Sequence, residues 1–180
     1  MSEVTPNELT RAYGLTGVVY FPHYSTSALE FHTKNFLSST GVPHDEIFTS
    51  RADVNDPEPD PIELGPLLEL DDQKCPEERR DWLALGYLRT ALIALDPRSG
   101  MVHAYPEGEL ESHPLHRDVE SFAFCMIEFK KLRDAKSADA DVALLVQDFR
   151  ESVTAHDSTP FRYEDSEWNL VLDEIRDGIW

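Results

Sequence analysis

Two histidines separated by a proline and a leucine are the strongest candidates for metal-based chemistry in this 180-residue chain. The pair is His113 and His116, and the acids around it are Glu109, Glu111 and Asp118. A hydrolytic zinc site needs three protein ligands and an open position for water. Pro114 lies within the pair, so the imidazoles are not held at helical spacing, and a further ligand would have to come from elsewhere in the chain. We therefore interpret residues 113–116 as a solvated loop, with a metal-dependent hydrolase as a lesser alternative.

Other side chains that could react have neighbours that indicate a structural role. The triplet His44-Asp45-Glu46 follows Gly41-Val42-Pro43, which is typical of a turn into a strand. Cys125 lies between Phe124 and Met126, an apolar setting that disfavours the thiolate form. The sequence contains no Gly-rich phosphate loop, no GxSxG and no HExxH. We therefore expect no enzymatic activity, no bound metal and no cofactor.

The elements that would position these residues are clearest in the middle of the chain. Residues 82–88, 90–95 and 101–105 are apolar runs of strand length, and residues 96–100 have the composition of a hairpin turn. Consecutive strands joined by short turns predict an antiparallel meander. We also expect a short strand at 47–49, and a strand at 62–70 that is interrupted at Gly65-Pro66.

Helical patterns lie on both sides of this meander. Apolar residues recur at helical spacing over 29–37, 122–132, 142–149 and 168–175, and Asp118 is a plausible N-cap for the second of these segments. Gly41 stands where a glycine commonly ends a helix. The sequence therefore predicts an α+β fold in one domain over residues 1–180, with a central antiparallel sheet flanked by N-terminal and C-terminal helices.

Negative charge is the most unusual property of the composition. The chain has 35 Asp and Glu against 16 Lys and Arg, which gives a net charge of −19. Such a surface repels nucleic acids and anionic membranes and attracts cationic proteins, although solubility is an alternative reason for it. A stretch without Lys or Arg concentrates the acids Asp53, Asp56, Glu58, Asp60, Glu63, Glu69, Asp71 and Asp72. Its prolines predict a loop over 53–61, and we expect these eight acids to contact a partner.

The order of several segments resembles a known family. A helix over 29–37 closes with Ser-Ser-Thr-Gly-Val-Pro at 38–43, Leu85-Gly86 precedes the strand 91–96, and the turn 98–100 leads into 102–105. A helix with Phe122 and Phe124 follows, and Trp-Asn-Leu-Val-Leu-Asp-Glu-Ile stands at 168–175. From Gly14 to the C-terminus, this order resembles the SUKH superfamily of bacterial immunity proteins, and its fourth group in particular.

The resemblance implies an antitoxin-like protein that binds a secreted polymorphic toxin, often a nuclease or a nucleic-acid deaminase. It carries no catalytic residues over to this chain. The hypothesis is therefore an immunity protein whose partner is a cognate basic toxin, with a non-catalytic scaffold of the same fold as the alternative. No apolar stretch approaches the roughly 20 residues that cross a bilayer, and residues 1–6 lack the features of a signal peptide, so we expect a cytoplasmic protein.

Overall fold

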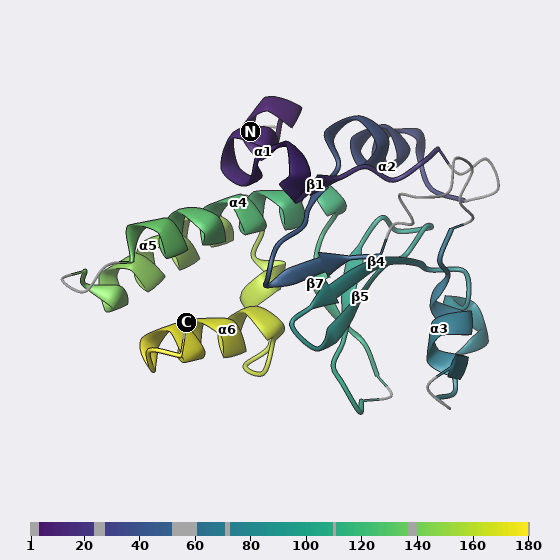
Figure 1. The fold of residues 1–180 in the computed structure, drawn as a ribbon. Coiled ribbons are helices and arrows are strands. Elements are labelled where there is room, and N and C mark those ends of the chain that lie inside the picture. Colours follow the sequence, from purple (N-terminus) through teal and green to yellow (C-terminus); the bar gives the residue numbers. More distant parts are fainter. Residues whose placement is uncertain are drawn as a thin grey trace.

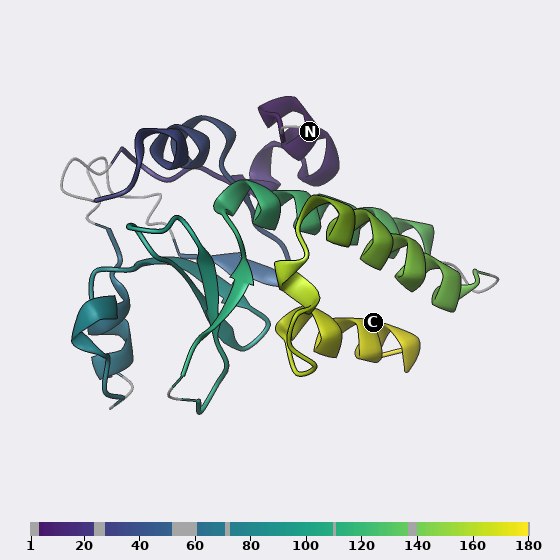
Figure 2. The same ribbon diagram turned by 180° about the vertical axis from the view of Figure 1, so that it is seen from behind.

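The computed structural model describes residues 4–23, 28–51, 61–70, 73–109, 111–136 and 140–179. Within these ranges the chain forms a five-stranded and a two-stranded antiparallel sheet with helices packed around them (Figures 1 and 2). The predicted α+β fold, a central antiparallel meander flanked by N-terminal and C-terminal helices, is confirmed. None of the helices in these ranges is long and apolar enough to span a membrane.

The larger sheet has its strands in chain order, each antiparallel to the next. They are β3 (Phe48–Ser50), β4 (Leu83–Leu88), β5 (Ala91–Leu95), β6 (Val102–Tyr105) and β7 (His113–His116), while β1 (Val18–Val19) pairs with β2 (Val42–Pro43) in the smaller sheet. The central strand β5 is buried along its whole length. Ile93 faces the main core, whereas Leu92 and Ala94 face a smaller cluster on the other side of the sheet. The alternation expected of a strand thus supplies apolar side chains to both faces.

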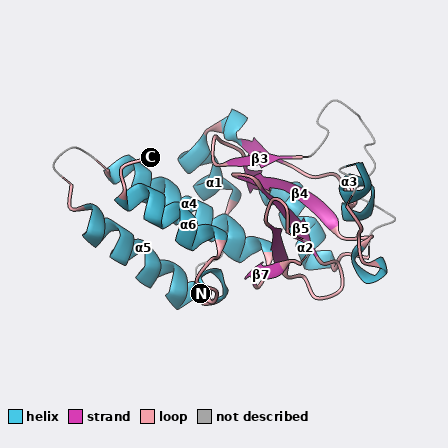
Figure 3. Ribbon diagram, turned by 90° about the horizontal axis from the view of Figure 1, so that it is seen from below, coloured by secondary structure: helices cyan, strands magenta, loops and turns pink. Residues whose placement is uncertain are grey.

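Helices account for most of the remaining described chain. They are α1 (Pro6–Tyr13), α2 (Phe31–Asn35), α3 (Leu64–Leu70), α4 (Val119–Ala135), α5 (Val142–His156) and α6 (Glu167–Arg176), with a π-helical turn at Phe36–Thr40 and 3₁₀ turns at Leu15–Gly17, Glu77–Arg79 and Thr159–Phe161. Asp118 is the N-cap of α4, as predicted, and accepts a hydrogen bond from the backbone N–H of Ser121 at 2.7 Å. Helices α5 and α6 lie at the end of the molecule opposite α3, with the sheet between them (Figures 1 and 3).

Two predicted elements were wrong. Residues 62–70 were expected to form an interrupted strand, but Leu64–Leu70 is helix α3. Pro66 lies in its first turn, where the missing N–H has no intrahelical partner to lose, and Leu64 and Leu68 are buried one turn apart. Residues 113–116 were expected to be a solvated loop, but they form β7 at the edge of the sheet. An edge strand with a register shift tolerates Pro114, which cannot donate to a ladder.

Candidate functional site

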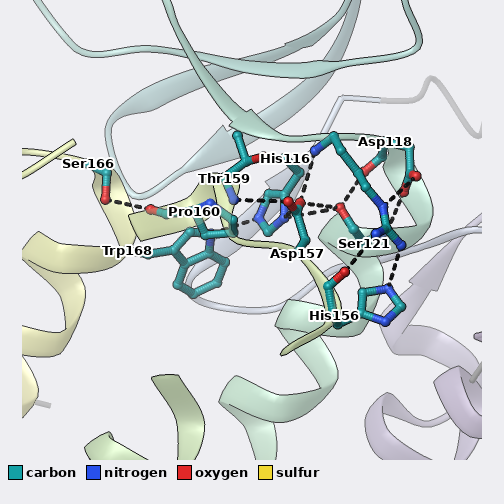
Figure 4. Close-up of polar contacts among 10 residues, drawn as sticks. His116, Asp118, Ser121, His156, Asp157, Thr159, Pro160, Ser166 and Trp168 are labelled. Carbon is teal, nitrogen blue, oxygen red and sulfur yellow. Dashed lines mark hydrogen bonds and ion pairs between the residues drawn. The ribbon is translucent and has the colours of Figure 1, made fainter. Parts of the chain in front are cut away.

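A buried polar centre joins the sheet to the C-terminal helices (Figure 4). His116, the last residue of β7, is fully buried, and its Nε2 accepts a hydrogen bond from Nε1–H of Trp168 at 2.9 Å. Because an indole N–H can only donate, the neutral imidazole carries its proton on Nδ1. That nitrogen lies 3.5 Å from Oδ2 of Asp157 and 3.4 Å from the hydroxyl of Ser121. Both ring nitrogens of His116 are therefore engaged inside the protein.

Asp157 is the acceptor on which this centre converges. Its Oδ2 accepts hydrogen bonds from the Ser121 hydroxyl at 2.8 Å and from the backbone N–H of Arg117 at 2.9 Å. Its Oδ1 accepts the backbone N–H of Thr159 at 2.9 Å. Burial alone would raise the pKa of Asp157, but the hydrogen bonds from His116 and from these backbone donors hold it well below the ordinary value. Burial lowers the pKa of His116 against the opposing effect of Asp157, so the pair consists of a neutral imidazole and a carboxylate.

Serine, histidine and aspartate are the residues of a nucleophilic triad, but their connections here are different. In a triad the serine donates to the histidine, and the aspartate orients the other ring nitrogen. Here Ser121 donates to Asp157, and Trp168 occupies Nε2 of His116. Ser121 is also only 1% exposed, so a substrate cannot reach its hydroxyl. The centre connects β7, the first turn of α4, the segment after α5 and the first turn of α6, and its role is to fix these elements to one another.

The histidine pair singled out in the sequence does not form a joint site. His113 and His116 belong to the same strand, but His113 packs against Tyr163, with ring centroids 5.6 Å apart, whereas His116 bonds Trp168. The carboxylate of Asp118 caps α4. In the part of the chain that the structure describes, no three His, Cys, Asp or Glu side chains gather closely enough to hold a metal ion.

An acidic groove lies beside this centre, on the surface. It has a volume of about 520 Å³ and lies between the connection from β6 to β7 and the segment that leads into α6. Its lining includes Glu109, Glu111, His113, Tyr163, Asp165 and Glu167. The sequence pattern suggested Glu109, Glu111 and His113 only as candidate ligands of a metal site. It did not predict the groove, because the two segments that form it are about fifty residues apart in the chain.

Comparison with known families decides the class of the protein. The model described as "SUKH-4 immunity protein" matches residues 4–174, nearly the whole chain. The chain belongs to the SUKH-4 immunity protein family. The predicted resemblance is thereby confirmed. Comparisons with curated proteins and with solved structures found no match.

In this SUKH-4 immunity protein, the eight acids that were predicted to contact a partner are separate in sequence from the closed centre. Residues 53, 56, 58, 60, 71 and 72, which carry most of those acids, lie outside the described residues. Glu63 is exposed just before α3, where it forms a β-bridge with Leu83. Glu69 is exposed on α3 and pairs with Arg80, whose hydrogen bond lowers the pKa of Glu69. Their role in binding stays a prediction.

Proposed function

We propose that this SUKH-4 immunity protein binds a cognate toxin with a basic active-site surface, a nuclease or a nucleic-acid-modifying enzyme, and neutralises it by covering that surface. The family match supports the immunity role, and the net charge of −19 supports the chemistry of the partner. Enzymes that bind phosphate backbones present clusters of Lys and Arg, and an acidic protein can occupy the same cluster. The protein acts by binding and not by catalysis, in the cytoplasm where it meets the toxin.

The stretch from Asp53 to Asp72 is the first contact surface in this proposal. It concentrates eight acids without a compensating Lys or Arg in the same stretch. Glu63 and Glu69 are exposed, and Glu63 lies just before α3, beside Leu83 at the start of β4. Charges of one sign gathered on one surface speed the encounter with an oppositely charged partner.

The test begins with a candidate toxin domain, sought among the genes that neighbour the gene of this chain. Co-expression should restore growth of cells that produce the toxin domain, and the purified protein should inhibit the toxin's activity in a stoichiometric complex. Growth arrest that continues at matched protein levels, with no complex, would refute the proposed function.

Charge reversal of Asp56, Glu58 and Asp60 to Lys tests the contact surface. We expect association to slow about tenfold at low salt and its salt dependence to flatten. The matched control reverses the exposed acids Asp134, Asp148 and Glu151 on α4 and α5, which changes the net charge by the same amount. Equal effects of the two sets on the association rate would show that the acidic stretch acts only through net charge.

A further inference from the structure

We propose that the acidic groove beside α6 receives one arginine side chain of the toxin, and that Glu167 is the carboxylate that pairs with its guanidinium. The identity of the occupant rests on the function proposed above.

Glu167 is a buried residue whose carboxylate has no partner among the residues that the structure describes. The residue is only 4% exposed and it lines the groove. Across the described residues, no hydrogen bond or ion pair includes its side chain. The charge of Arg89 favours the ionised form of Glu167, but its Nη2 donates to Glu174 at 2.5 Å. A buried charge without a partner is costly, so a carboxylate that opens into a groove is completed by a cation from outside.

Helix α6 does not remove this need. Glu167 is the first residue of the helix, after the N-cap Ser166, and the positive end of a helix stabilises a carboxylate. Burial nevertheless raises the pKa of Glu167, and the neighbouring carboxylates of Asp165 and Glu174 raise it further. Within the described part of the chain, the carboxylate of Glu167 is therefore an acceptor that no donor satisfies.

The rest of the groove is suited to a cation. Glu109, Glu111 and Asp165 add three carboxylates to its lining, and in the described ranges no Lys or Arg forms an ion pair with them. Arg79 lies at one side, but its guanidinium donates to the hydroxyl groups of Ser112 and Tyr105. A partner's cation would therefore meet no competing Lys or Arg from the described part of this chain.

Aromatic and apolar surface in the groove favours arginine over lysine. Tyr163 and Leu170 line it and are 38% and 42% exposed. A guanidinium stacks on an aromatic ring while it donates to a carboxylate in a fixed planar geometry, whereas an ammonium is more strongly hydrated. His113 next to Tyr163 contributes Nε2, a buried nitrogen that has no hydrogen-bond partner among the described residues. The volume of about 520 Å³ is within the range of sites that enclose small ligands, and it accommodates one long side chain.

The main test is Glu167→Gln, read out in two ways. Removing an unpaired buried charge should raise the melting temperature of the free protein by about 2–4 °C. The same substitution should raise the Kd for the cognate toxin domain about 30-fold or more, mainly through faster dissociation. Glu151→Gln on the exposed face of α5 makes the same charge change and should alter the Kd less than about twofold. Toxin binding that is equal for wild type and Glu167→Gln would overturn the inference while the proposed function stands.

A second measurement does not need the toxin. N-acetyl-arginine amide at millimolar concentration should shift the amide NMR signals of residues 106–109, 111–113 and 163–170, and the neutral isostere N-acetyl-citrulline amide should not. Equal shifts with both compounds, or none with the first, would refute an arginine site. Should Glu167→Gln fail to fold, the double variant of the exposed Glu109 and Glu111 to Gln tests the same groove, with an expected tenfold weaker binding. A protein that binds the arginine probe but does not protect against the toxin would refute the proposed function alone.

Discussion

Replacing Asp157 by asparagine should destabilise the protein by about 4 kcal/mol. Asparagine keeps one carbonyl oxygen, which can still accept the backbone N–H of Thr159, but places an NH₂ group where Oδ2 now accepts the backbone N–H of Arg117 and faces Nδ1–H of His116. The Ser121 hydroxyl can rotate, whereas those two N–H groups cannot. Each stranded buried donor costs about 1–3 kcal/mol, so two of them give about 2–6 kcal/mol. That is a large part of the 5–15 kcal/mol by which domains are typically stable.

Urea unfolding of wild type and Asp157→Asn measures this loss, with an unchanged m-value as the sign that both unfold in the same way. Asp148→Asn, an exposed change on α5, is the control and should stay within about 0.5 kcal/mol of wild type. The pH dependence adds an independent check. Because the pKa of Asp157 is lower in the folded than in the unfolded state, its stabilisation is present above about pH 4 and is lost as the pH falls further. A decrease in the free energy of unfolding of less than about 1 kcal/mol, with the same fall in stability at acidic pH as in wild type, would refute the view that Asp157 holds the helices to the sheet.

Two further predictions concern the core. Gly86→Ala should lower the free energy of unfolding in urea by about 3 kcal/mol or more, because Gly86 has a φ of +156° and a Cβ there would lie 2.3 Å from the carbonyl oxygen of Thr49. The control Gly108→Ala, at a φ of +81° with open space around it, should lower it by only about 1 kcal/mol. Equal losses for the two variants would contradict the steric explanation. The thiol of Cys125 should react with a disulfide reagent only after unfolding, because it is fully buried and burial raises its pKa well above the ordinary value; fast labelling of Cys125 in the native protein, located by mass spectrometry, would show that the core opens.

The parts of the fold that could be predicted from the sequence are those fixed by local signals. The turn at 96–100 and the apolar runs on both sides of it determine the pairing of β5 with β6, and the residues of the turn are neighbours in the chain. Asp118 marks the start of α4 because capping involves only the next three residues. For the same reason Gly41 could be recognised, since its φ of +81° follows directly from the end of a helical turn.

The errors arose where distant residues decide the structure. His113-Pro114-Leu115-His116 has no strand pattern of its own, and it becomes β7 through pairing with β6 and through the Trp168 indole, 52 residues away from His116. From the sequence, Glu167 is an ordinary acidic residue in the first turn of a helix. Its burial, and the groove in front of it, depend on the packing of two segments that share no sequence signal.

Two buried carboxylates show how this fold can separate stability from recognition. Asp157 and Glu167 are 6% and 4% exposed, yet Asp157 accepts hydrogen bonds from its own chain, whereas Glu167 has no partner among the described residues. The pKa of the first is accordingly lowered and that of the second is raised. The satisfied carboxylate lies against His116, whose Nε2 accepts the indole N–H of Trp168 on α6, and α6 in turn holds Glu167 at the groove. A toxin that supplies arginine there gains a charge-assisted pair, and one that does not leaves a buried charge unpaired, so Glu167 discriminates between partners chiefly by penalising the wrong one.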